Sequence, residues 1–163
     1  MALKRQPTYP FVPHSTTALL PGQFWAIPLS DGSFGCGRVI ELTSPGSIGA
    51  RVSFLAAVLD WNAHLLPNSE AIAGAMCLSQ GQAHLKVVTE SGGCILGHRA
   101  LELDGIEPWE FRGAEFHVNS HLHKGLRPVR PQERSDSSLP VLSTWGYRMP
   151  VIIAEAQFVK SRK

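Results

Sequence analysis

The segment that decides the fold is Gln23-Phe-Trp-Ala-Ile-Pro-Leu-Ser-Asp-Gly-Ser-Phe-Gly-Cys-Gly-Arg-Val-Ile-Glu-Leu42, in which two apolar runs flank an Asp-Gly pair. Asp-Gly between apolar runs is a strong hairpin signal, because a type I′ turn requires a positive φ at both of its central residues. The segment therefore predicts a strand over residues 23–30, a tight turn at 31–32 and a partner strand over 34–42.

Four residues inside this hairpin constrain its surroundings. Pro28 cannot donate a hydrogen bond to a neighbouring strand, so we expect it at a sheet edge or a bulge. Gly35 and Gly37 leave part of the second strand without side chains, which lets another backbone or a large ring approach closely. Arg38 is a charged residue in an apolar strand, and we expect it either to pair with a buried acid or to face a partner.

The remaining elements are shorter. Residues 50–60 form an apolar run that fits a buried strand or a helix, and its first residues favour a strand. A short helix is predicted over 71–73, between capping residues and a glycine. Further strands are predicted over 75–78, 83–89, 94–97 and 150–154, with 83–89 and 94–97 forming a second hairpin. This pattern predicts a mainly β (α+β) fold: a strongly bent antiparallel sheet or a partly open small barrel with one or two short helices.

The length of 163 residues is typical of one domain. Residues 1–20 contain Pro7, Pro10 and Pro13, and we expect a proline-rich arm that is either loose or laid over the core. Residues 21–163 are predicted to form a single β-rich domain. Within it, the polar and proline-containing residues 124–140 predict a long basic surface loop.

The cysteines and the N-terminus bear on the compartment. Cys36, Cys77 and Cys94 have no CxxC spacing and are odd in number, so we expect buried free thiols rather than disulfides. The N-terminus lacks an apolar run of signal-peptide length, and no stretch approaches the ~20 apolar residues that span a membrane. These features predict a cytoplasmic protein without a membrane partner.

Charge is unevenly distributed along the chain, although the net charge of +2 is too small to predict a nucleic-acid partner. Five acids lie between residues 102 and 115 against one base, and four bases lie between 124 and 134 against one acid. A tryptophan in the acidic window is a good interface anchor. An ordinary solvated surface is the alternative interpretation. The predicted partner-binding residues are Glu102, Asp104, Glu107, Trp109, Glu110 and Glu115.

Catalytic signals are weak. His117, His121 and His123 share strand parity, so a strand would place all three imidazoles on one face, where they could bind zinc. Glu115 has the same parity and could serve as a general base. However, the chain has no HExxH, GxSxG, GxGxxG or Walker sequence. We therefore expect no catalytic residues, no bound metal and no cofactor, and keep a metal-dependent hydrolase as an alternative.

A family resemblance begins at the same hairpin. Residues 20–40 (LPGQFWAIPLSDGSFGCGRVI) resemble the opening of the Immunity protein 26 family, whose members characteristically begin with a hairpin similar to PGD-F-IPL-DG-YGRV. Gln23 stands where an acidic residue is expected, and Cys36 stands beside the paired glycines. The likeness extends to about Pro108 and does not clearly include the histidines, the basic segment or the C-terminus. Looser matches occur at 54–61, 80–84, 95–97, Leu101 and 104–105.

The resemblance implies a bacterial antidote that binds and neutralises a toxin, and it implies no catalytic residues. We therefore expect an immunity protein that occludes the active site of a cognate toxin, with the acidic window suited to a basic toxin such as a nuclease. The first alternative is a nucleic-acid-binding small β-barrel, in which Arg127, Arg130 and Arg134 would contact phosphates. The second is the hydrolase based on the three histidines.

Overall fold

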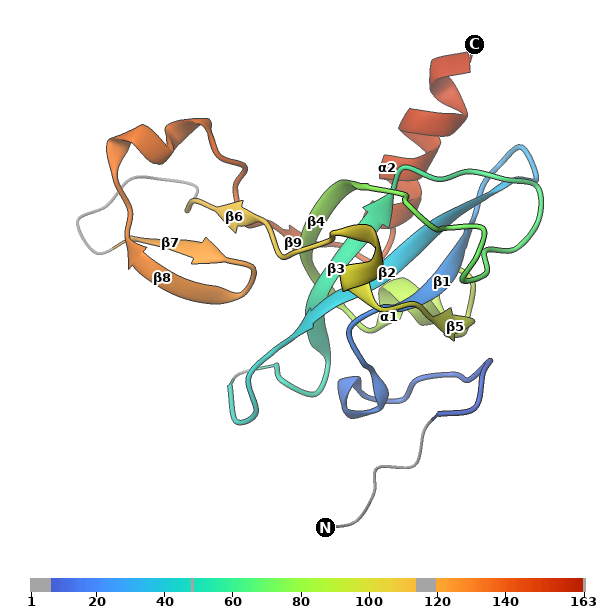
Figure 1. Ribbon diagram of the computed structural model, residues 1–163, viewed down its shortest axis with the longest axis horizontal. Helices are drawn as coiled ribbons and strands as arrows, with labels where there is room; N and C mark the ends of the chain where they lie inside the picture. The colour runs from blue at the N-terminus through green and yellow to red at the C-terminus, as the bar shows by residue number, and fades with distance from the viewer. Residues whose placement is uncertain (1–6, 48, 114–119, 163) are drawn as a thin grey trace.

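A computed structural model describes residues 7–47, 49–113 and 120–162, and its strands form two separate sheets (Figure 1). The larger sheet has six strands in the order β5-β1-β2-β3-β4-β9, and the smaller has the order β6-β7-β8. The predicted fold class, mainly β with a strongly bent sheet, is confirmed. In the described part of the chain the edge strands β5 and β9 do not pair, so the sheet is not closed into a barrel.

The strand bounds show how short the outer strands are. The larger sheet contains β1 (Gln23–Pro28), β2 (Phe34–Leu42), β3 (Ser53–Leu59), β4 (Cys77–His84), β5 (Gly97–His98) and β9 (Thr144–Trp145). Its pairs are antiparallel except β4 with β9. The smaller, antiparallel sheet contains β6 (Glu110–Phe111), β7 (His121–Lys124) and β8 (Arg127–Pro131).

Helical elements are few. The α-helices are α1 (Lys86–Thr89) and α2 (Met149–Phe158), and the 3-10 helices are η1 (Thr16–Ala18), η2 (Leu101–Asp104), η3 (Arg134–Ser138) and η4 (Lys160–Arg162). No helix in the described residues is long and apolar enough to cross a membrane.

The predicted hairpin is present as β1 and β2, but its turn differs from the prediction. β1 ends at Pro28, and the Leu29 N–H donates to the Ser33 carbonyl at 2.9 Å, so the connection is longer than two residues. Gly32 has a φ of 82°, whereas no described non-glycine residue has a positive φ. Asp31 therefore does not form a type I′ turn. Instead, its carboxylate accepts a hydrogen bond from the Ser33 N–H at 2.9 Å.

The expectations for proline and glycine in the hairpin are confirmed. β5 pairs only with Gln23 and Phe24, so β1 has no β5 partner at Pro28. Trp25 lies opposite Gly37, and a Cβ on Gly37 would overlap the indole ring. The missing side chain thus lets a large ring pack flat on the sheet.

The apolar run at 50–60 forms a strand that is buried on both faces. Phe54, Ala56 and Val58 of β3 point into one apolar cluster, which α1, α2 and the N-terminal arm help to cover. The alternate residues Leu55, Ala57 and Leu59 point into a second cluster on the opposite face. A strand covered on both sides has no polar alternation, so periodicity alone did not separate it from a helix.

The arm is laid over the core from residue 7 to residue 20. Phe11 forms a β-bridge with Ile95, and Leu19 is fully buried. Tyr9 packs against the first apolar cluster and accepts a hydrogen bond from the Gln23 side chain at 3.1 Å.

Five local predictions are wrong. The strand predicted at 83–89 ends at His84 and continues into α1, because Val87 and Val88 are buried in the first cluster. Residues 97–98 pair with β1, so no second hairpin forms. Residues 71–73 form turns rather than a helix.

The other two corrections lie in the C-terminal third. The predicted strand 150–154 lies in α2, where Pro150 occupies the first turn and Pro150, Ala154 and Phe158 are buried at helical spacing. The predicted surface loop 124–140 contains β8 and η3 instead.

Candidate protein-binding surface

The segment from Arg99 to Trp109 crosses the second face of the larger sheet. Leu101 and Ile106 insert into the apolar cluster on that face. Between them, η2 turns Glu102 and Leu103 outward, and Leu103 is 67% exposed. The segment is therefore fixed by buried side chains and presents an exposed apolar residue, Leu103, beside the exposed acid Glu102.

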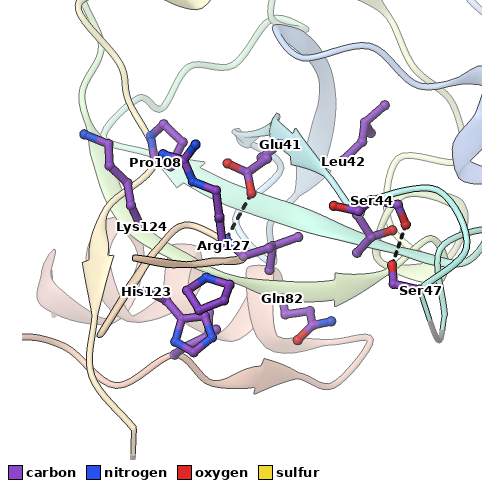
Figure 2. Close-up of a pocket in the computed structure, with 13 residues that line it drawn as sticks. Glu41, Leu42, Ser44, Ser47, Gln82, Pro108, His123, Lys124 and Arg127 are labelled. Atoms are coloured by element: carbon purple, nitrogen blue, oxygen red, sulfur yellow. Dashed lines mark hydrogen bonds between the residues drawn. The ribbon is translucent and has the colours of Figure 1, made fainter. Parts of the chain in front are cut away.

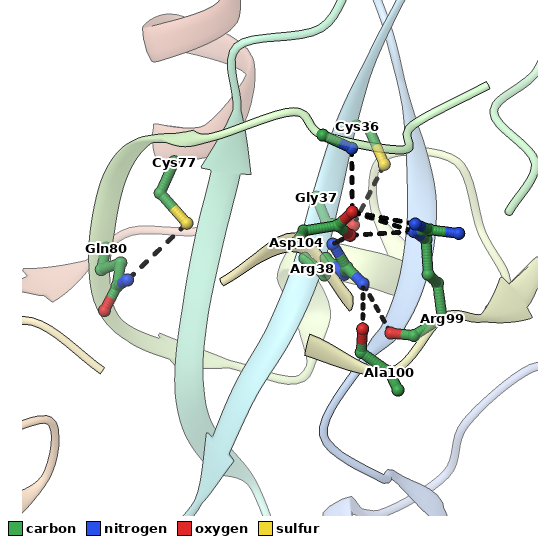
Figure 3. A network of polar contacts seen from close by, with 9 residues as sticks. Cys36, Gly37, Arg38, Cys77, Gln80, Arg99, Ala100 and Asp104 are labelled. Atoms are coloured by element: carbon green, nitrogen blue, oxygen red, sulfur yellow. Dashed lines mark hydrogen bonds and ion pairs between the residues drawn. The ribbon is translucent and has the colours of Figure 1, made fainter. Parts of the chain in front are cut away.

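The first polar anchor of this segment is a buried ion pair (Figure 3). Arg38 extends from β2, and its Nη1 donates to Asp104 at 2.8 Å, with both side chains 0% exposed. Its Nη2 donates to the Arg99 carbonyl at 2.5 Å. The Asp104 carboxylate also accepts from Arg99 Nε at 2.9 Å and from the Gly74 N–H at 2.8 Å. The anchor thus ties η2 to the sheet and to the loop that precedes β4.

These contacts shift the ionisation of Asp104. Burial by itself would raise the pKa of this carboxyl, but hydrogen bonds from Arg99, Gly74 and Arg38 outweigh burial and hold the pKa well below its usual range. The carboxylate therefore stays charged and balances the positive charge of the Arg38 and Arg99 guanidinium groups. Arg38 Nε is buried and has no hydrogen-bond partner among the residues that the structure describes.

The second anchor is the side-chain amide of Gln80 in β4. Its Nε2 donates to the Glu107 carbonyl at 3.0 Å, and its Oε1 accepts from the Trp109 N–H at 2.9 Å. Gln80 is buried, so both bonds form away from water. The amide thereby holds the backbone on both sides of Pro108 and fixes where Glu107 and Trp109 lie.

A hollow of about 320 Å³ opens between this segment and the start of β4. Burial raises the pKa of the Cys77 thiol, which lies in the wall. The hollow is lined by Met76, Cys77, Gln80, Ile106, Glu107 and Trp109, with Gly105 and Pro108 between them. Met76 is exposed at its edge. The lining therefore mixes apolar side chains with Gln80 and Glu107.

The predicted partner-binding residues differ in how exposed they are. Glu102, Glu107 and Glu110 are exposed, and Trp109 is half-buried. The prediction for Asp104 is wrong, because its side chain is fully buried in the first anchor and cannot form part of a contact surface. Glu115 lies outside the described residues.

Sequence reasoning missed three contributors to this surface. Exposed Leu103 and Met76 gave no signal, because single apolar residues occur on every protein surface. Gln80 lies in a short polar sequence, Gln80-Gly81-Gln82, which was not predicted as a strand. Its position within β4 is the only feature that would have marked it as an internal anchor.

A larger cavity, about 700 Å³, lies elsewhere, where the smaller sheet meets the end of β2 (Figure 2). Glu41 accepts a hydrogen bond from the Leu126 N–H at 3.0 Å across this junction. Basic side chains of the smaller sheet and hydroxyl groups of the loop after β2 face the space; they include His123, Lys124, Arg127, Ser44 and Ser47.

This cavity has no catalytic pairing among the described residues. The Ser47 hydroxyl bonds the Ser44 carbonyl, and His123 Nδ1 lies 3.2 Å from the His121 carbonyl. His121 and His123 share a face of β7 as predicted, but His117 lies outside the described residues. Within the described part of the chain, no group of three or more His, Cys, Asp or Glu residues is placed to hold a metal ion.

Comparison of the chain with known proteins gives no assignment. No protein-family model matches the sequence, and neither the curated proteins nor the solved structures contain a match.

Proposed function

We propose that this chain is a bacterial immunity protein that binds a cognate protein toxin and neutralises it by occlusion, without catalysis of its own. The contact surface comprises Glu102, Leu103, Glu107, Trp109 and Glu110. The proposal places the protein in the cytoplasm, a reducing compartment in which Cys36, Cys77 and Cys94 remain free thiols.

The observation that carries the proposal is the double anchoring of the surface. Asp104 and Gln80 each fix the backbone of the segment from inside the protein, so Glu102, Leu103 and Glu107 are presented without a loop that must order on binding. Preorganisation lowers the entropy cost of association. Exposed Leu103, next to exposed Glu102, also provides an apolar contact and charge complementarity to a basic partner.

The nucleic-acid alternative receives less support from the basic segment. Lys124 pairs with Glu107 at 3.2 Å, and Arg130 pairs with Asp136 at 2.7 Å. Two of the four bases in the segment are therefore partly neutralised by acids of the same chain. A phosphate-binding surface depends on cations that are free to replace counterions.

The test is co-expression of the tagged protein with the product of the gene adjacent to its own. We expect a stoichiometric complex and rescue of the cells from that product's toxicity. The variant Glu102→Lys/Glu107→Lys should weaken the complex, slow its association and remove most of the salt dependence. No complex with the neighbouring product, together with no rescue, would reject the proposal.

The charge-matched control is Glu90→Lys/Glu155→Lys, in which Glu155→Lys also removes the hydrogen bonds that Glu155 accepts from Ser30. Glu90 ends α1 and Glu155 lies in α2, so both are on elements that cover the opposite face of the sheet. This control makes the same change in net charge. If it weakened the complex as much as the first variant, the contact surface would lie elsewhere.

A further inference from the structure

We infer that the hollow beside Trp109 is a socket for a single cationic side chain of the partner, preferentially an arginine. The inference rests on the proposed function, because it specifies the chemistry of the partner at the same surface. It commits to a protein that presents an exposed arginine or lysine at its own contact surface.

The size and walls of the hollow suit one long side chain. Its volume of about 320 Å³ is at the lower end of pockets that enclose small ligands. Met76, Ile106 and Pro108 offer apolar contacts to a methylene stem. Trp109 also lines the hollow, and an indole is a ring on which a guanidinium can stack. Arginine fits better than lysine because its planar group both stacks and donates in a fork.

Glu107 supplies the charge that such a side chain requires. Its side chain is 75% exposed, and Oε2 accepts from Lys124 Nζ at 3.2 Å. Among the described residues, Oε1 has no hydrogen-bond donor. An entering guanidinium can therefore bind Oε1 while it competes with Lys124 for the carboxylate.

The socket is held by the same amide that anchors the segment. Gln80 bonds the backbone of Glu107 and of Trp109, so the two backbone positions from which the carboxylate and the indole extend are fixed. On its other side, the Trp109 carbonyl accepts from the Gly125 N–H at 2.8 Å. A site whose backbone is fixed on both sides binds a side chain of matching shape at a low entropy cost, so binding depends on shape as well as on charge.

The probe for the test is a capped tetra-arginine peptide, and the neutral isostere tetra-citrulline serves as its control. Titration followed by NMR reports on the indole N–H of each tryptophan. We expect saturable shifts at Trp109, little change at the buried Trp25 and Trp145, and no binding of the citrulline peptide. Glu107→Gln should weaken tetra-arginine binding roughly threefold to tenfold, whereas Glu102→Gln should change it less.

Lys124 provides a test with the opposite sign. Lys124→Gln removes the cation that competes for Glu107, so tetra-arginine should bind more tightly. Arg127→Gln is the matched control: it removes the same charge from the smaller sheet, and Arg127 has no ion pair in the described residues. A socket predicts a larger gain for Lys124→Gln than for Arg127→Gln. Equal gains would show diffuse electrostatics and overturn the socket.

The outcomes separate the socket from the proposed function. If tetra-arginine does not shift Trp109 while the toxin complex forms, the socket is wrong and the immunity function stands. If the peptide binds with the expected pattern but no toxin partner exists, the socket stands and the proposed function fails. Equal weakening by Glu102→Gln and Glu107→Gln would overturn the socket as well.

Discussion

The two sheets differ in how much of their strands is buried. In the larger sheet, six of the seven residues of β3 are buried, and both faces are covered by apolar clusters. In the smaller sheet, no residue of β8 is buried, and β7–β8 with η3 extend away from the body (Figure 1). The smaller sheet is attached through Phe111 of β6, which packs in the second apolar cluster, and through hydrogen bonds that include those of Glu41 and Gly125.

Each region contains an arginine–aspartate pair, and the two pairs differ in their exposure to solvent. Arg38–Asp104 and Arg130–Asp136 have nearly the same N–O distance, 2.8 and 2.7 Å. Their side-chain exposures are 0% and 0% in the first pair, but 41% and 6% in the second. Removing one member of a buried pair leaves an unpaired charge in the interior, which is costly. At the surface, water solvates the remaining charge, so the cost is small. Geometry alone therefore does not determine how much each pair stabilises the fold.

The largest effect is expected from Arg38→Ala. This change removes a fully buried side chain and leaves Asp104 with fewer donors in the interior, so the free energy of unfolding should fall by about 3–5 kcal/mol. Urea denaturation measures the loss. A loss below about 1 kcal/mol would mean that the buried pair is no more valuable than the exposed one.

Acid should have the next largest effect. The depressed pKa of Asp104 means that its contribution to stability is fully present above the unfolded-state pKa and is lost as the pH falls toward the folded-state pKa. Stability should therefore decrease from about pH 5 downward. The hydrogen bond from Ser33 lowers the pKa of Asp31, and the one from Arg130 lowers that of Asp136, so they add to this slope. Thermal unfolding of Asp104→Asn should show a shallower dependence on pH than the wild type.

Gly125→Ala should act on the smaller sheet alone. Gly125 has a φ of 61°, and an added Cβ would lie 2.8 Å from Glu41 Oε2 and from the Pro108 side chain. We expect a loss of about 1–2 kcal/mol. Hydrogen exchange should accelerate in β7 and β8 and remain unchanged in β2 and β3. Faster exchange throughout β3 would show that the two sheets unfold together.

The smallest effect is expected from Arg130→Ala. Because the guanidinium is partly exposed, the change should cost less than about 1 kcal/mol of unfolding free energy. The same denaturation experiment used for Arg38→Ala gives the direct comparison. A loss similar to that of Arg38→Ala would contradict the interpretation from burial.

The elements that could be predicted from the sequence are those with local causes. Asp31-Gly32 between apolar runs predicts the β1–β2 hairpin, and Gly37 predicts the close approach of a ring. The charge of Arg38 in an apolar strand predicts a buried acid as one of two outcomes. In each case the chemistry of one or two neighbouring residues limits the backbone or demands a partner.

Tertiary packing determines which residues those partners are and which acids face outward. Asp104 and Glu107 are three residues apart in one acidic window, yet one is buried against Arg38 and the other is exposed. Residues 150–154 have β-branched side chains typical of a strand, but packing on the sheet makes them helical. Burial and long-range hydrogen bonds depend on segments far apart in the chain, such as β4 and the segment that Gln80 holds, and no local pattern contains that information.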